Sequence, residues 1–177
     1  MSPSDSVHNM KFALHHLPEP IRWFIPQALI CHGFGSGLIR PASGTWGSLL
    51  AFLLLIVVFE PLTLALRIMS AFILYWVGYA SIKYITQKAK EPIGDASWIV
   101  IDEWAGLMIA SLLCNSVSGF FVAFLLFRLF DIWKPWPISW IDKTVHGPHG
   151  VMLDDVVAGI IALAIFGLLS YVRILPI

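Results

Sequence analysis

The stretch Trp104-Ala-Gly-Leu-Met-Ile-Ala-Ser-Leu-Leu-Cys-Asn-Ser-Val-Ser-Gly-Phe-Phe-Val-Ala-Phe-Leu-Leu-Phe127 decides the fold, because 24 residues pass without a charge. A helix that crosses the hydrocarbon core of a bilayer needs about 20 apolar residues. At the centre of this stretch, however, residues 114–119 contain Asn, two Ser and Gly, which is the composition of a turn. The stretch therefore forms either one membrane span or a helical hairpin with arms of roughly 99–113 and 117–133.

Three further runs without a charged residue predict helices on either side of this stretch. They cover residues 41–59, 68–82 and 156–172. The 177 residues are 58% hydrophobic and only 12% charged, whereas soluble domains carry about 25% charged residues. We therefore predict one all-α integral membrane domain over residues 1–177, with four to five membrane helices and a polar, flexible segment at 1–20.

The distribution of lysine and arginine favours the hairpin. If the N-terminus is cytoplasmic, the hairpin gives five spans and leaves only Arg67 and Arg173, of eleven cations, on the far side. A single span would also place Arg128, Lys134 and Lys143 there. An arm of about 15 residues reaches only about 22 Å, so the hairpin needs shielding by neighbouring helices or a thinner bilayer. The hairpin topology makes the polar loops face the cytoplasm.

Acidic residues gather where the apolar runs end, and seven of the eleven lie there. Acids at the ends of membrane helices are costly to bury and often functional, although a solvated or capping acid is the simpler explanation of any single one. Together they predict a metal site, and carboxylates without clustered Cys or His select a hard cation, for which we expect Mg²⁺. The candidate ligands are Asp102, Glu103, Asp131, Asp154, Asp155 and Asp95, and Asp142 is the seventh acid.

The sequence Arg128-Leu-Phe-Asp131-Ile-Trp-Lys134-Pro135 places one acid between two cations at intervals of three residues. On a helix these three side chains lie near one face, where they could serve a metal and a phosphate together. The proline is expected to end the helix. A patch of interfacial salt bridges flanked by tryptophans is the alternative explanation.

Asp154 and Asp155 directly precede the apolar run 156–172, so we expect the pair at the N-terminus of a helix. An Asp at such a position is a common N-cap. Two acids exceed what a cap requires, and successive helical residues point about 100° apart. One of the pair could therefore cap the helix while the other binds metal.

The stretch Pro41-Ala-Ser-Gly-Thr-Trp-Gly-Ser48 opens the first long run with small residues. Free N–H groups at such a helix start can bind phosphate, although small residues also occur wherever membrane helices pack tightly. We expect Arg40, Thr45 and Ser48 to bind substrate here. His146, in the polar loop before the last run, is a further candidate for substrate binding.

Five stretches together resemble phosphatidylglycerophosphatase A, a family of bacterial inner-membrane lipid phosphatases. The stretches are Gly33–Leu38, Pro41–Leu49, Ile99–Gly106, Phe127–Pro137 and Gly150–Gly159. Their most specific elements are Arg-x-x-Asp-x-x-Lys-Pro and Met-Leu-Asp-Asp, in this order after Ile-Asp-Glu. One departure is Ala42-Ser43, where the family more often has Ala-Pro or Val-Pro, and this difference concerns a turn rather than the chemistry.

The resemblance implies Mg²⁺-dependent hydrolysis of phosphatidylglycerol phosphate to phosphatidylglycerol and phosphate, in phosphatidylglycerol and cardiolipin biosynthesis. It implies a multi-pass protein of the bacterial inner membrane whose active site faces the cytoplasm, in agreement with the hairpin topology. The implied partner is the phospholipid substrate. A net charge of zero gives no reason to expect nucleic acid, and the sequence indicates no obligate protein partner.

We expect the acidic cluster and the neighbouring cations to catalyse this reaction. The acids would hold one or two Mg²⁺, and the cations would neutralise charge that develops on the phosphoryl oxygens. The expected catalytic residues are Asp102, Glu103, Arg128, Asp131, Lys134, Asp154 and Asp155. The alternatives are a phosphatase of another lipid phosphomonoester and a small membrane transporter, whose acids would be spread through the depth of the membrane.

Overall fold

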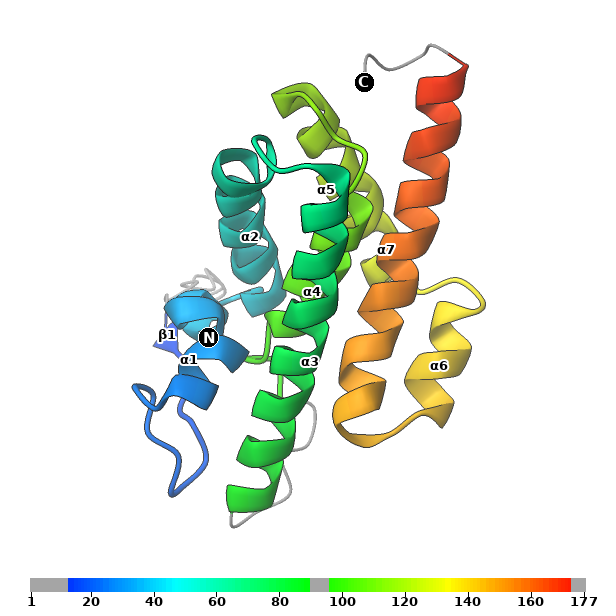
Figure 1. The fold of residues 1–177 in the computed structure, drawn as a ribbon. Helices are drawn as coiled ribbons and strands as arrows, with labels where there is room; N and C mark the ends of the chain where they lie inside the picture. Colours follow the sequence, from blue (N-terminus) through cyan, green and yellow to red (C-terminus); the bar gives the residue numbers. More distant parts are fainter. Residues whose placement is uncertain (1–12, 90–95, 173–177) are drawn as a thin grey trace, which may run out of the picture.

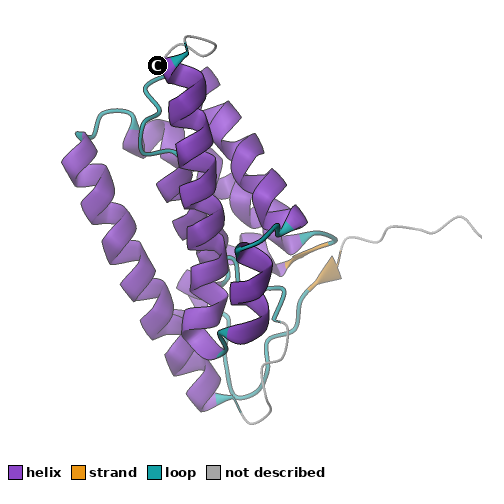
Figure 2. Ribbon diagram, turned by 90° about the vertical axis from the view of Figure 1, so that its right-hand side faces the viewer, coloured by secondary structure: helices purple, strands orange, loops and turns teal. Residues whose placement is uncertain are grey.

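The computed structural model describes residues 13–89 and 96–172, and this part of the chain is almost entirely helical (Figure 1). Its α-helices are α1 (Pro26–Cys31), α2 (Ser43–Phe59), α3 (Leu64–Lys88), α4 (Ile101–Ala110), α5 (Val117–Trp133), α6 (Ile138–Thr144) and α7 (Gly147–Tyr171). A 3-10 helix, η1 (Gly33–Leu38), follows α1, and two short antiparallel strands pair β1 (Ala13–Leu14) with β2 (Ile39–Arg40). Figure 2 shows the long helices running along one common direction. The predicted all-α fold is confirmed.

The uncharged stretch that decides the fold forms a helical hairpin. Helix α4 ends at Ala110, and α5 begins at Val117 after a turn. The turn is fixed by Ser116, whose hydroxyl accepts a hydrogen bond of 3.1 Å from the Gly119 N–H at the start of α5. The first turn of α4 and the last turn of α5 border the same cavity. The stretch is therefore two helices, as its central turn residues predict, and not one continuous span.

Two of the described helices, α3 and α7, are long and apolar enough to cross a membrane, at 25 residues each. Helix α2 is apolar but shorter, with 17 residues. The ten residues of α4 rise only about 15 Å. Helix α4 is instead surrounded by neighbouring helices, because it packs against α2, α3, α5 and α7 (Figure 1). This is the shielding that so short a hairpin arm needs. Of the predicted four to five membrane helices, two thus have the length of a span.

Two glycines allow α4 and α7 to touch through their backbones. A Cβ on Gly106 would lie 2.5 Å from the carbonyl oxygen of Asp155, and a Cβ on Gly159 would overlap the carbonyl oxygen of Gly106. No real side chain fits at such distances, so the crossing requires glycine on both helices. Gly106 follows Asp102 by four residues and Gly159 follows Asp155 by four, so each acid lies one turn from the crossing. The close crossing therefore brings the two acids together.

Arg67 joins the two hairpin tips at the other end of the bundle. It lies in the first turn of α3 and is buried, with 3% of its surface exposed. Its guanidinium donates hydrogen bonds of 2.5–3.2 Å to five backbone carbonyl oxygens, which belong to Phe59, Glu60, Leu62, Leu112 and Cys114. These residues form the α2–α3 turn and the α4–α5 turn. Arg67, which the charge pattern places on the side away from the cytoplasm, thus has a structural role.

Replacing Arg67 by methionine should lower the thermal stability of the purified protein. Methionine keeps a flexible apolar stem but has no N–H group, so the buried carbonyl oxygens lose their donor. An unpaired buried polar group costs about 1–3 kcal/mol, so we expect a loss of at least about 3 kcal/mol, or roughly 6–12 °C in Tm. A thermal unfolding curve in detergent measures this shift. The control is Arg22→Met, at an exposed arginine, and equal Tm values for the two variants would contradict the structural role.

Candidate active site

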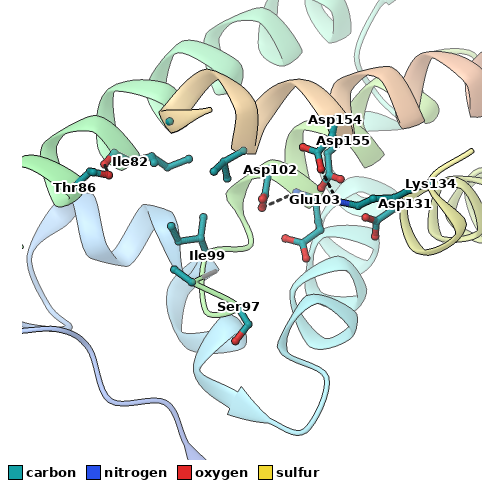
Figure 3. Close-up of a pocket in the computed structure, with 13 residues that line it drawn as sticks. Ile82, Thr86, Ser97, Ile99, Asp102, Glu103, Asp131, Lys134, Asp154 and Asp155 are labelled. Carbon is teal, nitrogen blue, oxygen red and sulfur yellow. Dashed lines mark hydrogen bonds and ion pairs between the residues drawn. The ribbon is translucent and has the colours of Figure 1, made fainter. Parts of the chain in front are cut away.

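A cavity of about 380 Å³ collects most of the predicted catalytic residues at one end of the bundle (Figure 3). The first turn of α4, the end of α5 and the first half of α7 meet there, and the C-terminal part of α3 forms another wall. The polar residues that line the cavity are Thr86, Ser97, Asp102, Glu103, Asp131, Lys134, Asp154 and Asp155. Residues that are far apart in the sequence thus share one site, at the end of the bundle opposite Arg67.

The segment before α4 fixes the position of the first two acids. The Val100 N–H donates a hydrogen bond of 2.8 Å to the carbonyl oxygen of Cys31 at the end of α1. On the other side, Gly47 of α2 leaves room for the Val100 side chain, which a Cβ at that position would approach to 2.5 Å. Because α4 starts directly after this clamped segment, its first turn presents Asp102 and Glu103 to the cavity.

Glu103 lies against the first turn of α2. Its Oε1 occupies the space in which a Cβ at Gly44 would stand. Its Oε2 is buried and has no hydrogen-bond partner among the described residues. The N-terminus of a helix carries a partial positive charge, which stabilises a nearby carboxylate. A buried carboxylate oxygen without a donor remains available for a cation or water.

Among the described residues, three of the five cavity acids have no cationic partner, and these three could hold a metal ion. Asp131 pairs with Arg128, and Asp154 pairs with Lys134. Asp102, Glu103 and Asp155 form no salt bridge with any residue in ranges 13–89 and 96–172. One carboxylate oxygen from each of these three lies within 4.8 Å of the others. Like charges at this separation repel strongly in a partly buried site, so the arrangement fits a divalent cation with hard oxygen ligands.

Arg128 is held by the first turns of α2 as well as by Asp131. Its guanidinium donates hydrogen bonds to Ser48 Oγ at 3.2 Å and to Thr45 Oγ1 at 3.4 Å. Ser48 is fully buried, and its own hydroxyl donates to the carbonyl oxygen of Gly44 at 2.8 Å. The two hydroxyls that we expected to bind substrate therefore contact Arg128 and orient it at the edge of the acidic cluster.

Lys134 bridges an acid inside the cavity and an acid outside it. Its ammonium lies 2.7 Å from Asp154 Oδ2 and 2.6 Å from Asp142 Oδ1. Burial alone would lower the pKa of this ammonium, but the hydrogen bonds to Asp142 and Asp154 raise the pKa above its ordinary value. Lys134 is thus a cation at neutral pH. Asp142, on α6, was noted in the sequence only as an acid near the end of a run.

Asp154 and Asp155 do not lie at a helix N-terminus, and this prediction was wrong. Helix α7 begins at Gly147 and contains Pro148 in its first turn, where proline is tolerated. The two acids follow about two turns later and are both buried. An apolar run marks only the most hydrophobic part of a helix, so it missed the first turns of α7. Neither acid caps the helix.

Two other candidates, Arg40 and His146, do not line the cavity. Arg40 is exposed, and its Nε donates a hydrogen bond of 3.1 Å to His15. His146 is the exposed residue before α7, and its side chain makes no capping hydrogen bond. Asp95 lies outside the described residues. The expectation that Arg40 and His146 bind substrate gains no support from their positions.

Fold and site together define a helical, membrane-associated protein whose cavity combines unpaired carboxylates with oriented cations, which is an arrangement suited to phosphoryl chemistry. The sequence model of the family described as phosphatidylglycerophosphatase A matches residues 29–170. The chain therefore belongs to the phosphatidylglycerophosphatase A family, as the resemblance of the five stretches predicted. It is a phosphatase, that is, a phosphoric monoester hydrolase.

Curated relatives cover most of the chain. The phosphatidylglycerophosphatase A of Haemophilus influenzae is 37% identical over 150 residues, which are 82% of this chain and 90% of that protein. The protein of the same name from Escherichia coli is 37% identical over 144 residues, 79% of this chain and 81% of its own length. A putative phosphatidylinositol-3-phosphatase of Bacteroides thetaiotaomicron is 34% identical over 156 residues, 84% and 96% respectively. No solved structure matches the chain.

Proposed function

We propose that this protein hydrolyses phosphatidylglycerol phosphate to phosphatidylglycerol and phosphate, and that Mg²⁺ is its cofactor. One observation carries the proposal: three carboxylates without a cationic partner converge beside Arg128 and Lys134. The two relatives named phosphatidylglycerophosphatase A support the choice of substrate. The reaction would complete phosphatidylglycerol synthesis and so precede cardiolipin synthesis.

The residues that would hold Mg²⁺ are Asp102, Glu103 and Asp155. Their oxygens are hard ligands at mutually close positions, and the unpartnered Glu103 Oε2 is the atom that most needs a cation. When bound, such an ion polarises a phosphoryl oxygen and acidifies water. Asp131 and Asp154, which we also predicted as ligands, lie in the same cavity and are paired with cations. Their proposed part is to keep those cations at the site.

Arg128 and Lys134 would bind the phosphoryl oxygens of the substrate. Arg128 is oriented by Ser48, Thr45 and Asp131 before any substrate arrives, and a preorganised cation stabilises developing negative charge better than a mobile one. In the reaction, a water oxygen adds to phosphorus, the bond from phosphorus to the glycerol oxygen breaks, and that oxygen takes up a proton. The two cations would balance the charge on the transferred group.

We further propose that the protein is a multi-pass protein of the bacterial inner membrane and that the cavity faces the cytoplasm. In support, the acids of α4 line the same cavity as Asp131 and Lys134 at the end of α5. Nine of the eleven Lys and Arg lie on that side when the N-terminus is cytoplasmic. The buried, structural role of Arg67 explains one of the two exceptions.

A second substrate class is a phosphoinositide. The relative from Bacteroides thetaiotaomicron, a putative phosphatidylinositol-3-phosphatase, is matched over 96% of its length. The acidic cluster and the cations recognise a phosphomonoester on either alcohol, so the chemistry of the site does not separate the two substrates. The remaining cavity wall, with Thr86 and Ser97, would contact the alcohol part of the lipid headgroup.

Phosphate release by the purified protein in detergent tests these proposals. We expect release from phosphatidylglycerol phosphate with Mg²⁺, no release after EDTA, and recovery when Mg²⁺ is restored. Phosphatidylinositol 3-phosphate is the parallel substrate. Faster release from that lipid would replace the proposed substrate and keep the enzyme class, whereas full activity in EDTA would overturn the metal-dependent mechanism.

A further inference from the structure

The hydrogen bonds of the Lys134 ammonium determine how many of its N–H groups can bind substrate. A lysine ammonium carries three N–H groups. One bonds Asp154 Oδ2 at 2.7 Å inside the cavity, and one bonds Asp142 Oδ1 at 2.6 Å outside it. Lys134 also lines the cavity itself. The described residues therefore leave one N–H group for a phosphoryl oxygen of the substrate.

Asp142 keeps the ammonium at the rim of the cavity. It lies on α6, which packs against α7 and so faces the helix that carries Asp154. Without Asp142, the charged partners of Lys134 among the described residues would all be acids of the cavity. Asp154 Oδ1 is buried and has no hydrogen-bond partner within the described ranges, so it offers the ammonium a second acceptor further in. The lysine would then neutralise the acidic cluster instead of binding substrate.

We propose that Asp142 is a positioning residue, which divides Lys134 between two carboxylates so that its third N–H group binds the phosphate of the substrate. This inference rests on the proposed hydrolysis of a lipid phosphomonoester. Asp142 itself does not line the cavity, and its hydrogen bond toward the site is the one to Lys134.

The same pair could be only a surface salt bridge, and the two explanations differ in what they predict. Both side chains are partly exposed, at 32% for Lys134 and 43% for Asp142. Exposed ion pairs contribute about 0–1 kcal/mol to stability. Asp142→Asn should therefore leave the Tm nearly unchanged under either explanation. Only the positioning role predicts weaker binding of phosphate.

The test compares Asp142→Asn with Asp142→Glu, which retains the charge, and with the control Glu60→Gln at an exposed acid near Arg67. For Asp142→Asn we expect KM for the lipid and the inhibition constant of orthophosphate to rise roughly tenfold, as for the loss of one charge-assisted hydrogen bond. Asp142→Glu should recover much of this loss, and Glu60→Gln should behave like the wild type. Unchanged constants in Asp142→Asn would overturn the proposal.

A double-mutant cycle makes the test specific. In a Lys134→Met background, Asp142→Asn should change neither constant further, because the group that it positions is gone. Equal effects of Asp142→Asn in both backgrounds would show that it acts without Lys134 and would overturn the proposal. Orthophosphate binding can also be measured as stabilisation against heat, without any lipid. Wild-type protein that binds orthophosphate through Lys134 and Asp142 but hydrolyses neither lipid would refute the proposed function and retain this inference.

Discussion

Gly159→Ala should reduce phosphate release about a hundredfold in a protein that still folds, because a misplacement of about 1 Å is enough for such a loss. The added Cβ would overlap the carbonyl oxygen of Gly106, so α7 must move away from α4. That movement separates Asp155 from Asp102 and Glu103, whose oxygens now lie within 4.8 Å of one another. Initial rates of phosphate release with saturating Mg²⁺ measure the effect.

Gly167→Ala is the matched control, because it makes the same substitution eight residues later in the same helix. A Cβ there would lie 3.5 Å from Leu113 Cδ1, which is an ordinary contact. Alanine is also the better helix former by about 1 kcal/mol at both positions. A loss of activity in Gly159→Ala alone must then come from the helix crossing. Activity above half of the wild-type value in Gly159→Ala would show that the crossing does not set the distance between the acids.

Asp155→Asn should lower kcat/KM by at least about a thousandfold, since a metal that polarises a phosphoryl group supplies several kcal/mol. Asparagine has the same shape but removes one of the three unpaired charges that would hold Mg²⁺. Steady-state kinetics over a range of Mg²⁺ concentrations measure the loss. We expect a higher Mg²⁺ concentration at half-maximal activity in any residual signal.

The same substitution should stabilise the metal-free protein. Asp155 is buried beside Asp102 and Glu103, and the repulsion between them is greatest when no cation is present. In EDTA, the Tm of Asp155→Asn should therefore exceed that of the wild type. The control Glu60→Gln, at the exposed acid near Arg67, should have the Tm of the wild type. A lower Tm together with lost activity would indicate that Asp155 supports the fold and would remove the case for a metal site.

Much of the fold could be predicted because the signals are local. The turn residues between Cys114 and Gly119 indicate the hairpin without any information about packing, and each of the four apolar runs overlaps a main helix. The cavity acids followed from the same reasoning, since the hairpin brings Asp102 and Asp131 to one end. The start of α7 was missed because a run without charges marks only the most hydrophobic part of a helix.

The partners inside the site could not be predicted, because they depend on tertiary distances. The spacing of Arg128 and Asp131 allows an ion pair within one helix, but the sequence does not show that Lys134 pairs with Asp154 while Asp155 has no salt bridge among the described residues. Asp142 reaches Lys134 only because the short helix α6 folds back onto α7. Ser48 was read as a substrate ligand from its place near a helix start, whereas its buried hydroxyl accepts from Arg128.

The position at which α4 begins determines how far the carboxylates of the cavity lie from the end of the bundle. The first residue of α4, Ile101, packs at the level of Gly78, where a Cβ would lie 3.2 Å from Ile101 Cγ1. Helix α3 continues from there to Lys88, which is about 15 Å further along its axis. Asp102 and Glu103, in the first turn of α4, therefore lie well inside the end of the bundle that α3 forms. In the membrane topology proposed above, a lipid would reach these carboxylates without being lifted out of the bilayer, which would cost about 0.8 kcal/mol for each methylene exposed to water.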